Sequence, residues 1–237
     1  MMSEPTRNPD QADVLDYDRV EPIIEQQPYP LLFVTVSGAH LYGFASPDSD
    51  VDLRGVHLLP AREVVSLDQN QETVELSRTD DGLEVDLVTH DLEKFIRLML
   101  KRNGYVLEQL YSPLTIRTSE IHQELKRLGY GCITRHHVNH YLGFARNQQK
   151  LLLKDDPPRV KPLLYVYRVL LTGIHLMQIG EIEANLVKLN ERFALTHIDE
   201  LIHRKREGSE DERLTETDLD FHKSEFQRLE AMLEKAG

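Results

Sequence analysis

The sequence predicts an α+β protein in which an N-terminal mixed β-sheet is followed by an all-helical C-terminal half. In the first part of the chain, apolar residues form short β-branched runs or alternate with polar residues, as they do in strands. From Leu92 onward they recur every three or four residues, as they do on one face of a helix. The composition shift places the boundary near residue 112, so we expect a sheet domain over residues 1–111 and a helical domain over residues 112–237.

Length, charge and cysteine content restrict the class of protein. The 237 residues, 40% of them hydrophobic, suffice for one large or two modest domains. The net charge of −12 argues against broad non-specific binding to nucleic acid or anionic membranes, although a local basic groove is compatible with it. The single Cys132 fits a reducing compartment. We expect no apolar run to reach the ~20 residues that span a membrane. The polar residues 1–18 lack a secretory signal and are expected to be a flexible lead-in, so we expect a cytoplasmic protein.

The first elements follow from local patterns. A short helix is expected over Val20–Gln27 because two prolines follow it closely. The continuous apolar run Leu31–Val36 is typical of a strand buried on both faces. A turn and a helical turn are expected over Ser37–Gly43, and a second strand over Val51–Leu59. These patterns predict that the sheet begins near residue 31.

A hairpin is expected next. The segments Glu72–Ser77 and Leu83–Val88 have strand patterns, and Asp81-Gly82 between them is a strong turn signal. Asp91 is then a suitable N-cap for a helix whose apolar stripe begins at Leu92. Further helices are expected at Tyr105–Tyr111, Glu120–Leu128, His137–Leu153, Val160–Ile179, Glu181–Phe193, Asp199–Arg206 and Glu216–Lys235.

An acidic constellation is the main functional signal. Asp50 and Asp52 are two residues apart on a predicted strand and therefore share one face. Two adjacent carboxylates cost free energy unless a cation binds between them. If the strand of Asp86 lies beside theirs, at the ~4.8 Å spacing of neighbouring strands, three carboxylates converge. They could then hold two Mg²⁺ ions, with Mn²⁺ as an alternative. Backbone N–H groups at the Ser37-Gly38 turn could bind phosphate.

These residues resemble the DNA polymerase beta-like nucleotidyltransferase superfamily. Its signature is a small Gly/Ser turn after a strand, an Asp-x-Asp about ten residues later, and a third acid on a later strand. The segments Val36–Gly43, Ser46–Gly55 and Lys161–Arg168 are similar to one branch, the RlaP-like predicted nucleotidyltransferases associated with RNA repair. The resemblance covers most of residues 31–180. Many relatives have Gly-Ser at the turn, where this chain has Ser37-Gly38.

The resemblance implies transfer of a nucleoside monophosphate from an NTP to a hydroxyl group. Asp50 and Asp52 would hold both metals, and Asp86 would bind the catalytic metal and help to activate the hydroxyl. Ser37-Gly38 would bind the β- and γ-phosphates. RNA as the acceptor is implied by the resemblance alone, and protein or small-molecule acceptors stay open, as does the oligomeric state.

One helix face could complete a nucleotide site. Lys161, Tyr165 and Arg168 are spaced i, i+4, i+7 and lie on the same face of the predicted helix. We expect this face to contact the triphosphate, with Tyr165 stacking on a base or sugar. A solvated face with a half-buried tyrosine is the alternative.

Each acidic signal also has a structural interpretation. Asp50 could cap the preceding turn, Asp86 could be a solvated strand residue, and Ser37-Gly38 could be an ordinary tight turn. The alternative function is a non-catalytic nucleotide-binding or partner-binding protein on the same fold.

Overall fold

The computed structural model of the chain describes residues 17–47, 49–67, 71–80, 82–207 and 213–237. The expected flexible lead-in falls almost wholly outside the described residues, as do Asp48 and Asp81. The chain forms two compact units, which we call the sheet unit (1–41 and 48–132) and the helical unit (42–47 and 133–237). The α+β class predicted from the sequence is confirmed.

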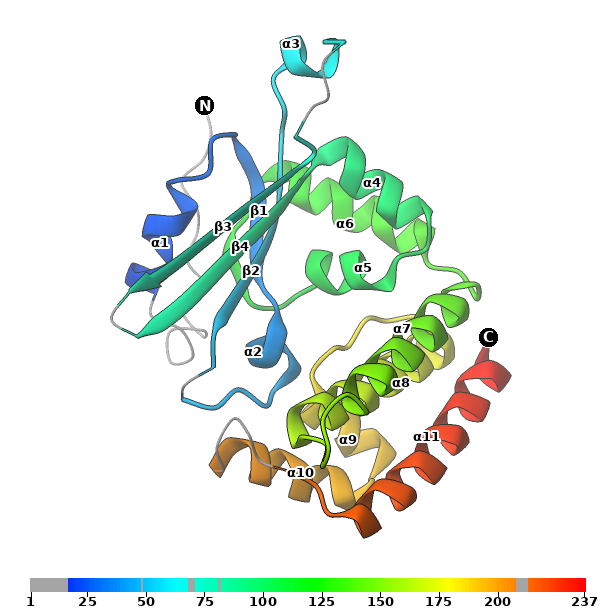
Figure 1. Cartoon of the computed structure of the whole chain (residues 1–237). Helices are drawn as coiled ribbons and strands as arrows, with labels where there is room; N and C mark the ends of the chain where they lie inside the picture. The colour runs from blue at the N-terminus through cyan, green and yellow to red at the C-terminus, as the bar shows by residue number, and fades with distance from the viewer. Residues whose placement is uncertain (1–16, 48, 68–70, 81, 208–212) are drawn as a thin grey trace. The chain divides into compact units, whose positions relative to one another are not determined.

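The sheet unit is built on a mixed five-stranded sheet with the strand order β3-β4-β2-β1-β5. Its strands are β1 (Leu31–Val36), β2 (Val51–His57), β3 (Thr73–Asp80), β4 (Leu83–Asp91) and β5 (Thr115–Arg117). Strands β2 and β4 run parallel, and the other pairs are antiparallel. The predicted hairpin is confirmed, because β3 and β4 pair along their whole length (Figure 1).

Helices cover both faces of this sheet, as Figure 1 shows. The helices of this part of the chain are α1 (Tyr17–Ile24), α2 (Gly38–Tyr42), α3 (Ala61–Val64), α4 (Leu92–Leu100), α5 (Gly104–Leu110) and α6 (Glu120–Cys132), of which α3 lies beyond the end of the sheet. Helix α1 packs Val20, Ile23 and Ile24 on one face of the sheet. On the other face, Phe33 of β1 contacts Phe95 of α4 edge-on. Asp91 caps α4 as predicted, because its carboxylate accepts a hydrogen bond from the Glu93 N–H.

The unit boundary lies later in the chain than the predicted residue 112. Strand β5 pairs with β1, and α6 packs on α4, α5 and β1, so both elements belong to the sheet unit. Helix α6 has a helical sequence pattern, and β5 has too few residues to be identified as a strand. The sequence pattern therefore places both elements in the predicted helical domain. The four-residue α3 was not expected either, and it buries no side chain that would mark it in the sequence.

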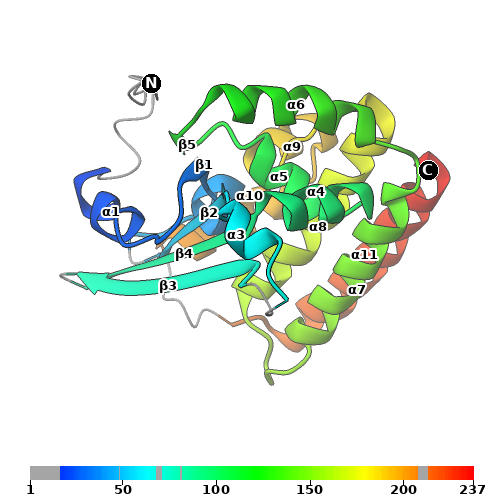
Figure 2. The same cartoon turned by 90° about the horizontal axis from the view of Figure 1, so that it is seen from above.

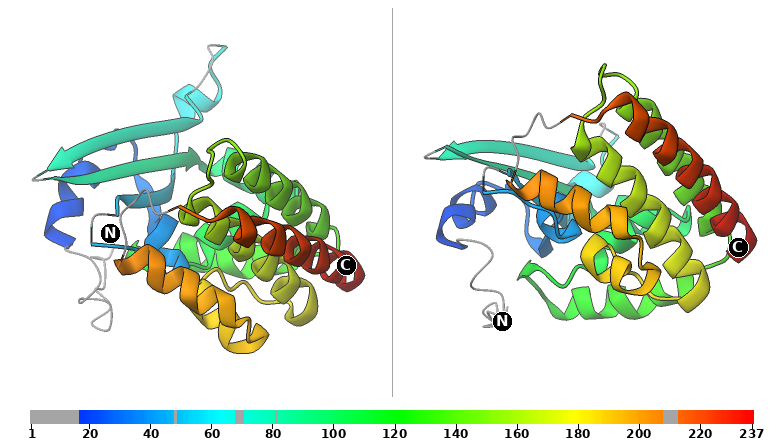
Figure 3. Two further views of the ribbon diagram at one scale, coloured as in Figure 1. Left: turned by 60° about the horizontal axis from the view of Figure 1, so that its bottom comes forward. Right: turned by 90° about the horizontal axis from the view of Figure 1, so that it is seen from below.

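The helical unit is arranged around one long apolar helix, α8 (Val160–Ile179). Around it lie α7 (His137–Leu152), α9 (Leu186–Phe193), α10 (Thr196–Glu207) and α11 (Glu216–Ala236). In Figure 2 and Figure 3, α7 and α11 run alongside α8. Helix α9 begins later than the predicted residue 181, because the Asn185 side chain caps it by accepting from the Val187 and Lys188 N–H groups.

Helix α8 corrects the expectation that no segment is long and apolar enough to span a membrane. Its 20 residues pass that test of length and composition, with a mean hydropathy of 1.2 in the most apolar window. However, 67% of that window is buried inside the protein. This burial is typical of the core helix of a folded domain.

Candidate active site

The sheet places two of the three predicted carboxylates side by side. In the parallel pairing of β2 and β4, Asp52 is the register partner of Asp86. Their neighbours Val51, Leu53 and Val85 are buried in the core on the α1 side. Because side chains alternate along a strand, Asp52 and Asp86 both project from the opposite face, and both are partly exposed.

The third carboxylate lies at the edge of this arrangement. Asp50 precedes β2 by one residue and is exposed. Within the described residues, no three His, Cys, Asp or Glu side chains are gathered closely enough to hold a metal ion. The backbone therefore fulfils the predicted pairing of Asp52 with Asp86, while the three side chains are not assembled around one point.

An arginine occupies part of the space at this acidic pair. The Arg54 Nη2 donates to Asp52 Oδ1 at 2.8 Å, and its Nε donates to the Tyr105 hydroxyl at 3.2 Å. Burial opposes the charged guanidinium, but Tyr105 and Asp52 outweigh it, and the pKa of Arg54 is raised. Tyr105, on α5, was not identified from the sequence because it is far from the acidic motif along the chain. Asp52 is thus neutralised by a neighbouring cation.

The Ser37-Gly38 turn abuts Asp52 directly. The Ser37 N–H donates to the Asp52 carbonyl at 2.8 Å. Gly38 has a φ of +61°, and a Cβ on this residue would lie 2.0 Å from Asp52 Oδ2. Glycine is therefore required here both for its backbone conformation and for space. The Ser37 hydroxyl is buried and has no hydrogen-bond partner among the described residues. An orphaned hydroxyl next to a side-chain-free turn is the kind of feature that a bound oxyanion would satisfy.

His40, three residues after Ser37, was given no role by the sequence and also faces this site. Burial lowers its pKa, while a backbone hydrogen bond with Ser49 and the charge of Asp52 partly offset that effect. Its Nε2 is buried without a hydrogen-bond partner among the described residues. The site therefore combines a buried imidazole nitrogen, a buried hydroxyl and paired carboxylates.

The donor set is compatible with a hard divalent cation, because carboxylate and hydroxyl oxygens are the ligands that Mg²⁺ prefers. Asp52 and Asp86 are already neighbours, so an ion between them would require Asp52 to exchange its contact with Arg54. Asp50, which lies just before the start of β2, would have to turn toward them.

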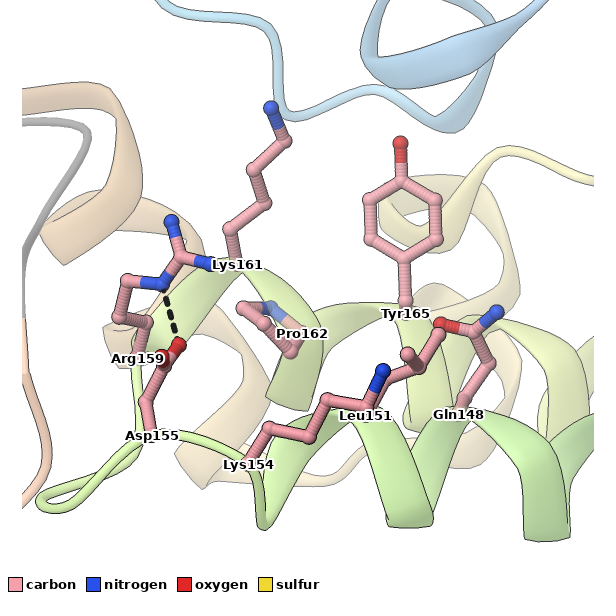
Figure 4. Close-up of a pocket in the computed structure, with 8 residues that line it drawn as sticks. All are labelled: Gln148, Leu151, Lys154, Asp155, Arg159, Lys161, Pro162 and Tyr165. Carbon is pink, nitrogen blue, oxygen red and sulfur yellow. Dashed lines mark hydrogen bonds and ion pairs between the residues drawn. The ribbon is translucent and has the colours of Figure 1, made fainter.

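The helical unit contains a separate pocket of about 340 Å³. Figure 4 shows that its walls come from the end of α7, the following loop and the start of α8. Its lining combines cations, an amide, a carboxylate and apolar groups: Gln148, Leu151, Lys154, Asp155, Arg159, Lys161, Pro162 and Tyr165. Arg159 is held by Asp155 at 2.7 Å. This mixture suits an anionic ligand with a flat apolar part.

The predicted helix face divides between this pocket and the core. Lys161 and Tyr165 line the pocket, and in Figure 4 their side chains extend in the same direction. Arg168 does not join them at the surface. It is completely buried, and its guanidinium lies 4.1 Å from the centre of the Tyr42 ring and 5.4 Å from that of Phe144. Arg168 can therefore contact a triphosphate only if these rings move.

Comparison with known proteins gives consistent matches. Residues 13–236 match the family described as RlaP, RNA repair pathway DNA polymerase beta family. An uncharacterized protein of Methanocaldococcus jannaschii, MJ0002, is 33% identical over 156 residues, which cover 65% of this chain and 63% of the relative. The match thus spans slightly less than two thirds of that relative's length. The uncharacterized Bacillus subtilis protein YcgL is 26% identical over 224 residues, which cover 90% of this chain and 84% of YcgL.

One solved structure is a distant match. It is a nucleotidyltransferase-like protein from Exiguobacterium sibiricum, 12% identical, with coverage of 93% of this chain and 73% of that one. Its TM-score of 0.37 is below the level at which two folds are taken as alike.

Proposed function

This chain belongs to the RNA repair pathway DNA polymerase beta family, and from that membership we propose that it transfers a nucleoside monophosphate from an NTP to a hydroxyl group. A polymerase beta-like nucleotidyltransferase is the activity that the family supports. The end of an RNA is the first acceptor to test, because the family is described by RNA repair. We further propose that the protein acts in the cytoplasm.

One observation carries this proposal. Asp52, the register partner of Asp86, lies against the Ser37-Gly38 turn, where a hydroxyl is buried without a partner among the described residues. Phosphate groups bind at turns with accessible N–H groups, and divalent cations bind where carboxylates are paired. The two features occur together at the same end of β2.

Different residues would bind the metal ions and the phosphates of the NTP. Asp50, Asp52 and Asp86 would hold Mg²⁺ ions, for which Mn²⁺ is an alternative. When bound, these ions would neutralise phosphate charge and increase the acidity of the attacking hydroxyl. Gly38 would bind the β- and γ-phosphates through its backbone N–H and Ser37 through its hydroxyl, because the Ser37 N–H already donates to the Asp52 carbonyl. The Arg54 guanidinium, released from Asp52, could then pair with a phosphate oxygen.

We propose that the pocket of the helical unit also binds nucleotide, through its own residues. Lys161 and Lys154 would supply positive charge for phosphate oxygens, and the Tyr165 ring would pack against a base or sugar. Arg168, which was expected to contact the triphosphate, would support this site from within the core.

The direct test uses purified protein, Mg²⁺ and each of four α-labelled NTPs, with and without a mixed pool of RNA. Labelled RNA, or release of pyrophosphate with label on another acceptor, would establish transfer. Saturable NTP binding with no product under any of these conditions would contradict it and favour a non-catalytic nucleotide-binding protein. The Arg54–Asp52 ion pair is the observation that favours this alternative, because it neutralises a proposed metal ligand internally.

A further inference from the structure

The segment Tyr42–Pro47, which we call the linking segment, packs as part of the helical unit although it is surrounded in sequence by the sheet unit. On its N-terminal side is the turn Ser37-Gly38, and a few residues after it come Asp50 and Asp52. Both halves of the proposed active site are therefore attached to the ends of one short stretch of chain. Whatever fixes this stretch restrains both halves.

Aromatic contacts hold the first half of the linking segment. The side chains of Tyr42 and Phe44 are buried, and each packs edge-on against the Tyr165 ring of α8, at 5.5 and 5.6 Å. The Arg168 guanidinium lies over the Tyr42 ring, 4.1 Å from its centre. A cation over an aromatic ring is attractive, and more so when both are removed from water.

Polar contacts from α10 hold the rest. The Lys205 side chain is 1% exposed, and its ammonium donates to the Ser46 hydroxyl at 2.8 Å. The next residue, Arg206, donates to the Gly43 carbonyl at 2.6 Å. Gly43 has a φ of +82°, and a Cβ there would lie 2.5 Å from the Asn185 side chain, so this contact admits only glycine. The linking segment is thus held from α8, from α10 and from the cap of α9.

Burying an arginine and a lysine is a costly way to pack a loop. A buried cation loses its hydration, and apolar side chains of similar volume often give equal or greater stability. Directional contacts, in contrast, hold the groups that they bind in one position, as Lys205 does for the Ser46 hydroxyl and Arg206 for the Gly43 carbonyl. The free-energy cost of burying these cations is explained if a fixed position of the linking segment matters more than its contribution to stability.

We propose that Arg168 and Lys205 are positioning residues for nucleotidyl transfer: they fix the linking segment, and through its two ends they restrain α2, which follows Ser37, and Asp50, which precedes β2. This inference rests on the proposed function. A misplacement of about 1 Å in a reacting constellation can reduce the rate about 100-fold, so a small shift of the segment suffices. Neither residue needs to touch the nucleotide.

The test compares Lys205→Met with Tyr167→Phe in the full chain. Tyr167 is buried next to Arg168 on α8, and its hydroxyl hydrogen-bonds to His222 Nδ1 at 2.7 Å, away from the linking segment. Both variants remove a buried polar contact of the same unit, so they should lower the melting temperature similarly. Two readouts are followed: the hydrogen exchange of the Ser37 and Leu41 amides, and kcat separately from the NTP dissociation constant.

We expect Lys205→Met to increase exchange at Ser37 and Leu41 at least tenfold, about 1.4 kcal/mol, and to reduce kcat by a similar factor with little change in NTP affinity. Tyr167→Phe should change neither readout. If Lys205→Met does not fold, Arg206→Ala removes an exposed side chain that binds the same segment and should act in the same direction.

The two proposals fail differently. Unchanged exchange at Ser37 and Leu41 in the α10 variants overturns the positioning role, as does increased exchange with an unchanged kcat. Absence of transfer by the unaltered protein, together with increased exchange in Lys205→Met, supports the link through the segment and contradicts only the proposed function.

Discussion

The two units use charged and polar residues in opposite ways. In the sheet unit, Asp52 and Asp86 stay partly exposed, and the Ser37 hydroxyl beside them is buried without a partner among the described residues. In the helical unit, Arg168 and Lys205 are completely or almost completely buried, against Tyr42 and Ser46. The sheet unit keeps its acidic pair accessible to solvent, whereas the helical unit buries these two cations in internal contacts.

This difference separates ligand binding from positioning. A group that binds substrate needs exposure and spare hydrogen-bonding capacity, which cost stability in the free protein. A group that fixes a backbone needs burial and direction. Under the proposed function, the acidic pair and the Ser37-Gly38 turn would be the substrate-binding part, and the interior of the helical unit would be the supporting part. Substitutions in the two parts should therefore fail in different ways.

The largest effect is expected at the acidic pair. Asp52→Asn should reduce nucleotide transfer to background, because it removes a charge needed to bind a divalent cation. Its stability should change by only about 1 kcal/mol, since the Arg54 contact is a partly exposed ion pair. Transfer assays and thermal unfolding check the two expectations.

Glu84→Gln is the matched control for this substitution. Glu84 lies on β4 two residues before Asp86, on the same face, and is exposed. The control removes the same charge from the same sheet face, so transfer should be retained. Near-normal transfer by Asp52→Asn would contradict the proposal that this acidic pair binds the catalytic metal.

The next largest effect is expected at Gly38. Gly38→Ala places a methyl group where Asp52 Oδ2 lies and strains a backbone with a φ of +61°. We expect transfer to fall on the order of 100-fold, because both the turn and Asp52 must shift. Gly82→Ala is the control, since Gly82 has a φ of +78° but nothing within 4 Å of a Cβ. That variant should lose about 1 kcal/mol of stability through strain alone and keep its activity. Equal activities in the two variants would contradict the contact between turn and carboxylate.

The sequence predicted the substrate-binding part better than the supporting part. Strand Leu31–Val36 and helix Val160–Ile179 have the predicted bounds, since local periodicity determines both. The Asp52–Asp86 pairing was expected because alternation fixes the face of each residue, although the order of the strands had to be assumed. Local motifs carry this information because their residues are close along the chain.

Long-range packing explains what the sequence did not reveal. The contact of Lys205 with Ser46 joins residues 159 positions apart, and no periodic pattern marks either one. Arg168 shares a helix face with Lys161 and Tyr165. Spacing alone could not show that this face is buried in the core at Arg168, one helical turn after Tyr165. The roles of Tyr105 and of β5 depend likewise on partners far along the chain.

A smaller effect is expected at the pocket of the helical unit. Lys161→Ala should weaken NTP binding about tenfold, or about 1.4 kcal/mol, with a smaller change in kcat at saturating NTP. Lys150→Ala removes the same charge from the exposed part of α7 outside the pocket and should bind NTP normally. Titration of fluorescent NTP at two salt concentrations measures both. Equal weakening in the two variants would indicate a general effect of charge and would place the nucleotide elsewhere.

The smallest effect concerns pH, and in this respect the two units should behave alike. Burial lowers the pKa of His122 in the sheet unit and of His222 in the helical unit to about 4. Both imidazoles are therefore neutral in the folded protein, while in the unfolded chain they take up protons near their ordinary pKa of 6.5. The unfolded state binds more protons between these values, so stability should fall as pH decreases from 6.5 toward 4.

His222→Gln, which can still bond to Tyr167, should flatten this fall by a few degrees of melting temperature. His136→Gln, at an exposed position of the same unit, is the control for the loss of a histidine side chain. A steeper dependence of stability on pH in His222→Gln would show that the buried imidazole is charged in the folded state. The helical unit would then contain a third buried cation besides Arg168 and Lys205.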